Sequence, residues 1–228
     1  MTDHVHDLAS VREATSRLLS AAASLDDAAL AAPSRLPGWT RGHILAHLAR
    51  NADALVNVLT GRPMYASAEA RDADIQRDAP RPLAVQLADL REGAARLQRA
   101  ADGITDWSRT VVLRNGVTDT AARVPLRRWT EVEIHHVDLD IGYELEDLPG
   151  EFTDREIAFL AQRFAGRDDL PAIEIVADDG HAWHTGAARG TALTVTGPAP
   201  DLLGWLTGRR APRALDAGGA PVPTLPPF

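Results

Sequence analysis

The sequence predicts an N-terminal four-helix bundle followed by a small C-terminal α+β domain. Four long segments in the first part place apolar residues three and four positions apart, which is the spacing of one helix face. After the breaker Leu148-Pro149-Gly150, the pattern changes to one helix and several short strands of alternating residues. We therefore expect a helix-bundle domain over residues 1–150 and an α+β domain over residues 151–228.

The first two long helices are bounded by clear local signals. Apolar spacing predicts a helix over residues 3–24, and a Pro- and Gly-rich breaker follows at residues 33–38. Thr40 then has the position of an N-cap, because a threonine hydroxyl can accept a bond from the first free backbone amides of a helix. That helix is expected to reach Leu59.

Two further long helices complete the predicted bundle. Residues 62–81 are polar and predict a loop that contains a helical turn around residues 68–77, and residues 83–103 predict the third long helix. Residues 109–113 and 117–124 predict a pair of strands around an Asn115-Gly116 turn. The fourth long helix is expected over residues 126–144.

The second part begins with a helix and continues with strands. Thr153 and Glu156 have the spacing of a capping box, which would begin a helix that ends at Gly166. The expected strands and the last short helix cover residues 172–177, 181–185, 193–196 and 198–207, in that order.

Composition excludes several kinds of chemistry. The net charge is −8 and the arginines form no basic stripe, which argues against a nucleic-acid partner. No apolar run approaches the ~20 residues of a membrane span and no signal peptide is evident, so we expect a cytoplasmic protein without a membrane partner. The chain has no cysteine and no lysine, so any metal must be held by nitrogen and oxygen ligands.

A polar stripe on the fourth predicted helix is the first candidate site. Glu131, His135 and Asp138 are four and three positions apart, so they share one helix face. Such residues can bind one divalent ion or make an ordinary surface pair. Taken alone, the stretch favours the surface pair, since polar pairs one turn apart are common on solvated helices.

A histidine on the second long helix could complete a site. His47 falls in the apolar stripe that contains Ile44 and Leu48, so it should face the other helices of the bundle. A hydrogen-bonded core histidine is the commoner interpretation of such a residue. Across the core, however, His47 could meet Glu131 and His135, and two imidazoles with one carboxylate are a ligand set of catalytic zinc.

His136 is the main alternative to His135 as the second histidine ligand. If His136 is not a ligand, we expect it to pair with Glu133 or Asp140 on the outer face of the helix. Glu131 is preferred to Glu133 because only Glu131 has a histidine four residues further on.

Two other pairs of residues are weaker candidates for a function. His181 and His184 flank a strand pattern without a well-placed third ligand. Arg209 and Arg210 could hold an acidic substrate by bidentate contacts, although a solvated pair at a helix end is the commoner interpretation.

Several stretches resemble the mycothiol-dependent maleylpyruvate isomerases, which belong to the wider DinB-like metalloenzyme superfamily. The resemblance covers nearly the whole chain and implies a DinB-like four-helix bundle with a C-terminal module. The stretches are Leu36-Pro37-Gly38-Trp39-Thr40, residues 43–53 (HILAHLARNAD), Pro63-Met64-Tyr65, residues 69–75 (EARDADI), residues 131–138 (EVEIHHVD), residues 204–209 (GWLTGR) and Leu225-Pro226-Pro227.

The resemblance implies roles for particular residues. It implies a zinc ion on His47, Glu131 and His135, and it implies that Asp138 lines a thiol-binding pocket. An arginine of the C-terminal domain would assist catalysis; Arg209 matches best, with the adjacent Arg210 as the alternative. The thiol cosubstrate would be mycothiol.

The implied reaction is the cis–trans isomerisation of maleylpyruvate to fumarylpyruvate. A zinc-bound thiolate would add to the double bond, the resulting single bond would rotate, and elimination of the thiol would leave the trans isomer. One alternative is a mycothiol S-transferase that acts on another electrophile, in detoxification or biosynthesis. A non-catalytic metal-binding module is the less favoured alternative.

Overall fold

A computed structural model describes residues 3–226 of the chain. The chain divides into two compact units, Met1–Gly142 and Tyr143–Phe228, so the division falls before the expected boundary at residue 150. The predicted combination of an N-terminal helix bundle and a small C-terminal unit with a sheet is confirmed. Within residues 3–226, no helix is both long enough and apolar enough to cross a membrane.

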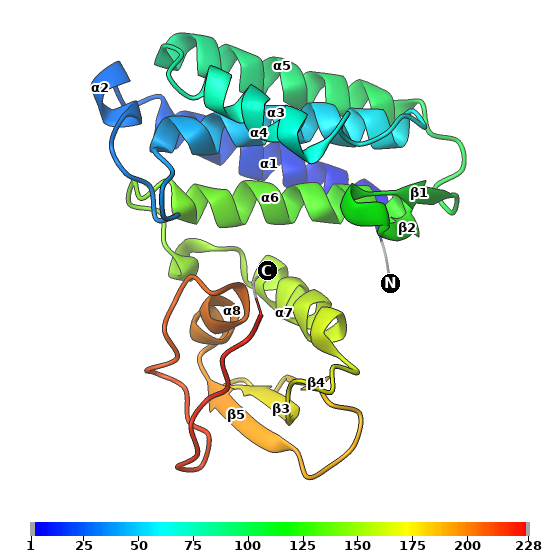
Figure 1. Ribbon diagram of the computed structural model, residues 1–228, viewed down its shortest axis with the longest axis vertical. Helices are drawn as coiled ribbons and strands as arrows, with labels where there is room; N and C mark the ends of the chain where they lie inside the picture. Colours follow the sequence, from blue (N-terminus) through cyan, green and yellow to red (C-terminus); the bar gives the residue numbers. More distant parts are fainter. Residues whose placement is uncertain (1–2, 227–228) are drawn as a thin grey trace. The chain divides into compact units, whose positions relative to one another are not determined.

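Four long helices form the bundle of the first unit. Helix α3 packs against α5 and α6, and α1 packs against the same two helices, so the four close around one core (Figure 1). Helix α4 lies along α3. The helices of this unit are α1 (His4–Ala22), α2 (Asp27–Leu30), α3 (Arg41–Leu59), α4 (Ala68–Asp78), α5 (Leu83–Asp102) and α6 (Val124–Asp138).

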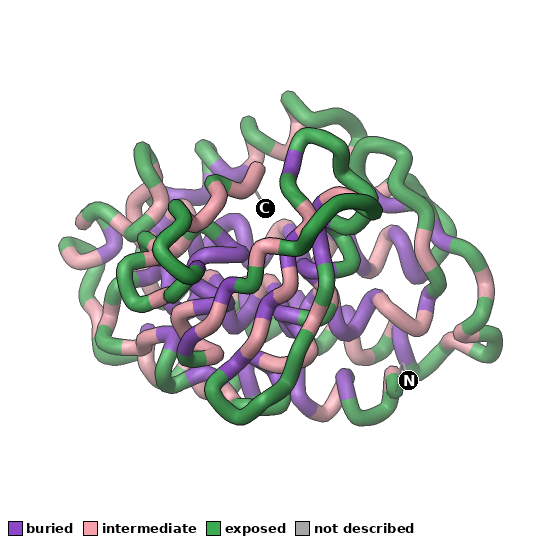
Figure 2. The backbone as a smooth tube through the Cα atoms, turned by 90° about the horizontal axis from the view of Figure 1, so that it is seen from below, coloured by how far each residue is buried: buried purple, intermediate pink, exposed green. Residues whose placement is uncertain are grey.

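The predicted spacing of apolar residues produces the observed core. Ile44, Leu48 and Leu55 of α3 are each at most 1% exposed. Buried and exposed backbone alternates along the helices in Figure 2, as expected for helices with one inward face. Burial of a leucine-sized side chain contributes about 1.5–3 kcal/mol, so this stripe supplies much of the stability of the bundle.

The start of α3 follows the prediction. Thr40 is its N-cap, and the Thr40 side chain accepts a hydrogen bond from the backbone amide of His43. The Nδ1 atom of His43 lies 3.2 Å from the backbone nitrogen of Thr40, which completes a capping box.

The end of α6 differs from the prediction, because the helix stops at Asp138 and not at residue 144. Asp140 has a left-handed backbone with φ of 55°, which no continuing helix allows. The loop before α3 covers this end: the amide of Arg35 donates to the Asp138 carbonyl at 2.9 Å, and Arg41 Nε donates to the Leu139 carbonyl at 2.8 Å.

Helix α4 occupies the part of the polar segment where a helical turn was predicted, residues 68–77. Ser67 caps its first turn by accepting a hydrogen bond from the amide of Ala70. Ile75 is the one apolar residue of α4 that is fully buried, so the segment carries no apolar stripe for the sequence to reveal.

The predicted hairpin is present in a shorter form. Strand β1 (Thr110–Val112) pairs antiparallel with β2 (Thr118–Thr120). A 3₁₀ turn, η1 (Arg114–Gly116), joins them, and Asn115 and Gly116 have φ of 58° and 74°. A second turn, η2 (Ala121–Arg123), leads directly into α6.

The second unit packs helices against a three-stranded sheet (Figure 1). The strand order is β4-β3-β5, with β4 antiparallel and β5 parallel to the central β3. The elements are η3 (Leu145–Asp147), α7 (Gly150–Phe164), β3 (Ala172–Ala177), β4 (Ala182–Gly186), β5 (Leu193–Gly197) and α8 (Ala199–Thr207).

The predicted capping box of α7 is wrong. The helix already begins at Gly150 after the N-cap Pro149, so Thr153 lies inside it and donates its hydroxyl to the carbonyl of Pro149. Thr153 and Glu156 are at most 3% exposed. A proline and a glycine at the start of a helix carry no side-chain acceptor, which made Thr153 the more visible signal.

Candidate metal centre

Helices α3 and α6 bring His47, Glu131 and His135 together. Glu131 Oε2 lies 2.9 Å from Nε2 of His47 and 3.4 Å from Nε2 of His135. The two imidazole rings are 4.7 Å apart and nearly perpendicular. One ligand atom from each residue lies within 4.8 Å of the others, so the three side chains could share one ion.

This donor set fits a zinc ion. Ligands bound at zinc–nitrogen and zinc–oxygen distances of about 2.0–2.2 Å in a tetrahedron are separated by about 3.3 Å. The two separations from Glu131 Oε2, 2.9 and 3.4 Å, lie on either side of this value. Three protein ligands of nitrogen and oxygen leave a fourth position open, as in catalytic zinc sites.

Asp138 orients His135. Its carboxylate lies 2.8 Å from Nδ1 of His135 and is fully buried. A ring N–H that donates to a carboxylate leaves the other ring nitrogen, Nε2, as the free lone pair that faces Glu131.

His47 has a different outer partner. Arg71 of α4 places Nη2 3.2 Å from Nδ1 of His47. A guanidinium can only donate, so Nδ1 accepts and the ring proton of a neutral His47 lies on Nε2, toward Glu131. A metal on Nε2 would move that proton to Nδ1, and Arg71 would have to turn away from it.

The electrostatics favour the metal-binding form of two of the three candidate ligands, His47 and Glu131. Burial alone would lower the pKa of the third, His135, but the hydrogen bonds and charges of Asp138 and Glu131 raise it above its usual value. Burial lowers the pKa of His47 to about 4, although the Glu131 carboxylate opposes the shift. Burial alone would raise the pKa of Glu131, but the charges and hydrogen bonds of His47 and His135 bring it well below its usual value. A neutral imidazole and an ionised carboxylate are the forms that coordinate metal.

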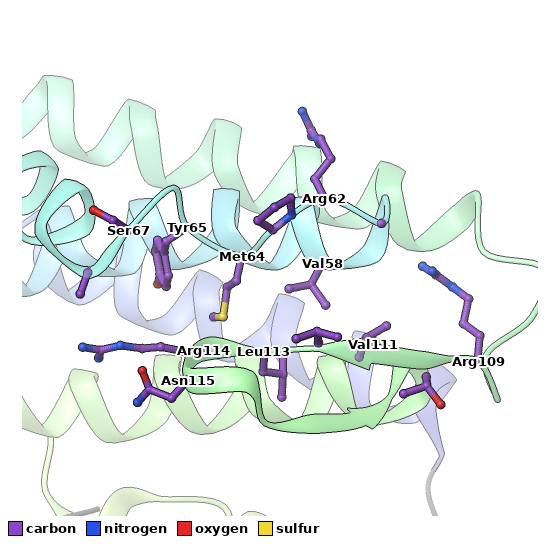
Figure 3. A pocket seen from close by; sticks show the side chains of 15 residues that line it. Val58, Arg62, Met64, Tyr65, Ser67, Arg109, Val111, Leu113, Arg114 and Asn115 are labelled. Atoms are coloured by element: carbon purple, nitrogen blue, oxygen red, sulfur yellow. The ribbon is translucent and has the colours of Figure 1, made fainter.

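A pocket of about 510 Å³ lies in the same unit (Figure 3). It is bounded by the segment that joins α3 to α4 and by β1 with η1. Tyr65 lines the pocket, and the guanidinium carbon of Arg71 lies 5.9 Å from the centre of its ring. Since Arg71 also contacts His47, these two residues connect the pocket wall to the cluster.

The rival residues of α6 lie elsewhere. Glu133 is fully buried, accepts a hydrogen bond from the Trp129 indole and forms an ion pair with Arg17 of α1. His136 is 2% exposed, so it does not lie on an outer face as its alternative role required.

The candidates of the second unit have other neighbours. His181 lies near Asp154 and Asp179, not with His184, and these side chains are exposed or half-buried. They form a surface cluster with no further sign of a ligand.

The two adjacent arginines differ in their contacts. Arg210 pairs with both oxygens of Glu146, at 2.6 and 2.9 Å, and with Asp201 at 3.2 Å. Arg209 donates to the Thr207 carbonyl at 2.8 Å. Arg210 therefore holds η3 to α8.

Three residues near the cluster were not predicted to have a function. They are Tyr65, Arg71 and Arg128, of which Arg128 is 1% exposed. Arg128 stands one helical turn before Glu131, and this spacing was a usable signal. Tyr65 and Arg71 lie in two of the stretches that carry the family resemblance, residues 63–65 and 69–75, but the resemblance implied no role for either residue.

The fold and the cluster define a class, a helix-bundle protein with a His-Glu-His group of the kind that binds metal. Residues 11–140 match the family pattern described as the mycothiol maleylpyruvate isomerase N-terminal domain, and residues 147–226 match the family's C-terminal (MDMPI) domain. The chain therefore belongs to the mycothiol maleylpyruvate isomerase family, and this membership marks it as an enzyme.

Solved structures agree with the family assignment. A crystal structure of the mycothiol-dependent maleylpyruvate isomerase is 26% identical in sequence, with a TM-score of 0.89 over 99% of this chain and 97% of that chain. A histidine-to-alanine mutant of that enzyme gives 26% identity and a TM-score of 0.88 with the same coverage. No curated protein sequence matches significantly.

Proposed function

We propose that the protein is a zinc enzyme that uses mycothiol to isomerise maleylpyruvate to fumarylpyruvate. The observation that carries the proposal is the convergence of three ligand atoms from α3 and α6 within 4.8 Å, in a chain of this family. The name of the matched crystal structure supports the choice of thiol and substrate.

In the proposed site, His47, Glu131 and His135 hold the zinc ion, and Asp138 fixes the ring of His135. Bound zinc lowers the pKa of a coordinated thiol, so that the thiolate is available at neutral pH. The chain has no cysteine, so no thiol of its own competes for the open position.

The remaining chemistry belongs to the substrate and to charged side chains. Addition of the thiol to the cis double bond makes it a single bond, which rotates before the thiol leaves, so no atom is gained or lost overall. Negative charge develops on the enolate oxygen after addition, and a guanidinium stabilises it. We propose Arg209 for this role, as the resemblance implies.

The direct experiment combines metal analysis with a paired assay. Purified, zinc-replete enzyme is given mycothiol with maleylpyruvate, and in parallel mycothiol with a generic electrophile. We expect turnover of maleylpyruvate, stoichiometric zinc in the wild type, and loss of both in His47→Ala. Glu131→Gln is expected to abolish turnover.

A matched variant controls for histidine loss from α3. His43 lies one turn before His47 and is not part of the cluster, so His43→Ala should keep its zinc. Conjugation of the generic electrophile without isomerisation would indicate a mycothiol S-transferase. Metal-free protein of unchanged stability would refute the zinc site and indicate a non-catalytic module.

A further inference from the structure

The pocket beside the cluster has an unusual charge for this protein. The chain carries a net charge of −8, yet the described residues that line the pocket include three arginines and no carboxylate. They are Arg62, Arg109 and Arg114. An acidic protein that keeps one pocket basic has a site suited to an anion.

Tyr65 marks the end of this pocket that is joined to the metal cluster. Figure 3 shows its ring extending from the α3–α4 segment toward Arg114 on the opposite wall. Behind it, Arg71 reaches both the Tyr65 ring, at 5.9 Å, and Nδ1 of His47, at 3.2 Å. The other terminal nitrogen of Arg71, Nη1, forms an ion pair with the Asp72 carboxylate at 2.6 Å.

Arg128 adds a fixed positive charge from inside the bundle. Its Nη1 donates to the Leu48 carbonyl at 2.8 Å and to Asn51 Oδ1 at 2.7 Å. Its Nε and Nη2 are buried and have no hydrogen-bond partner among the described residues. Burial lowers the pKa of Arg128 to about 10, with Glu131 and Tyr65 among the groups that oppose the shift, so it stays charged at neutral pH.

Positive charges of Arg71 and Arg114 and the negative charge of Glu131 all act on Tyr65. Burial and the Glu131 carboxylate raise the pKa of Tyr65, while Arg71 and Arg114 oppose the shift, so the phenol keeps its proton. Glu131 is already paired with two histidines. Arg114 makes no ion pair with any carboxylate in the part of the chain that the structure describes.

We propose that Arg114 and the Tyr65 hydroxyl bind a carboxylate of the electrophilic substrate, with Arg71 and Arg128 as supporting charges. The proposal rests on the proposed function and names residues that would bind a carboxylate of its acidic substrate. The planar fork of a guanidinium matches the two oxygens of a carboxylate, and a phenol adds one further donor.

Such a site selects against neutral electrophiles. A neutral group would remove water from Arg114 and Tyr65 without replacing the lost hydrogen bonds.

Direct binding of a probe tests the proposal without turnover. Succinate is titrated calorimetrically into the zinc-loaded enzyme and into metal-stripped enzyme, with succinamide as the uncharged analogue. We expect succinate to bind both forms and succinamide to bind neither. Arg114→Gln should weaken succinate about tenfold, which corresponds to about 1.4 kcal/mol, and Arg114→Lys should restore part of the loss.

Arg62→Gln is the matched control. Arg62 lines the same pocket and is exposed like Arg114, but it bonds Thr60 Oγ1 at 3.1 Å and points away from Tyr65 in Figure 3. Its loss should leave succinate affinity within about twofold of the wild type. Equal affinity in the two variants, or equal binding of succinamide, would overturn the proposal.

The two proposals fail in different ways. If the enzyme isomerises maleylpyruvate but Arg114→Gln and Arg62→Gln bind succinate alike, the anion site is wrong and the isomerase stands. If Arg114→Gln selectively loses succinate but no turnover occurs with abundant zinc, the anion site stands and the isomerase is wrong. In a working isomerase, Arg114→Gln should raise KM for maleylpyruvate far more than it lowers kcat.

Discussion

Replacing Asp138 by asparagine tests how this buried carboxylate acts. Its contact with Nδ1 of His135 is 2.8 Å long, and the Asp138 side chain is fully buried. A hydrogen bond to a charged group contributes about 1.5–3 kcal/mol. Loss of an outer partner of a metal-bound histidine weakens metal binding about 10- to 100-fold, or about 1.4–2.7 kcal/mol, which agrees with that range.

Asparagine keeps an acceptor oxygen, so the lower end of the range applies. We expect Asp138→Asn to weaken zinc about tenfold, because a neutral hydrogen bond replaces the charge-assisted one. A competition titration against a chromophoric chelator measures the affinity, and circular dichroism checks that the fold is retained.

Asp140→Asn is the matched control, since it makes the same change two residues further on. The Asp140 side chain is 52% exposed and pairs with Arg35 at 3.1 Å, so zinc affinity should not change. Equal zinc affinity in the two variants would refute the orienting role of Asp138. An unchanged affinity together with a higher KM for mycothiol would support direct contact between Asp138 and the thiol instead.

Two further predictions concern stability. Burial alone would raise the pKa of Asp78, but hydrogen bonds from Arg77 and the charges of nearby arginines lower it below 3.8. Asp78→Asn should therefore lower the free energy of unfolding in urea by about 2 kcal/mol at about pH 7 and 5. The difference in stability between wild type and variant should shrink as the pH falls through the lowered pKa. A constant difference down to acid pH would contradict this prediction. Gly42→Ala should lower the free energy of unfolding by about 1–3 kcal/mol, because a Cβ there would lie 2.3 Å from the Ala79 carbonyl oxygen. Gly150→Ala is the control, because there is open space around Gly150. Equal stability of the two variants would contradict the close approach at Gly42.

Local signals were sufficient for most of the bundle. Apolar spacing located the long helices, and Thr40, as the N-cap, marked the start of α3. Both signals are local, because capping and helix periodicity involve residues within four positions of each other. Helix α4 was predicted only as a helical turn, since a helix held by one buried apolar side chain, Ile75, shows no apolar stripe.

The places where prediction and structure differ depend on distant residues. Helix α6 ends at Asp138 because Arg35 and Arg41, about a hundred residues earlier, cover its last carbonyls. The start of α7 was misplaced because Pro149 and Gly150 begin the helix without a side-chain cap.

The sequence by itself determined that Glu131, His135 and Asp138 share one helix face, because helix geometry dictates which neighbours along the chain align. Only the tertiary structure decided that His47 meets them, since 84 residues separate His47 from Glu131 and the packing of α3 on α6 sets their distance. The same packing decided that Asp138 is buried against His135, and that Tyr65 and Arg71 connect a basic pocket to the cluster. These contacts follow from how helices and loops from separate parts of the chain fit together, which no local pattern encodes.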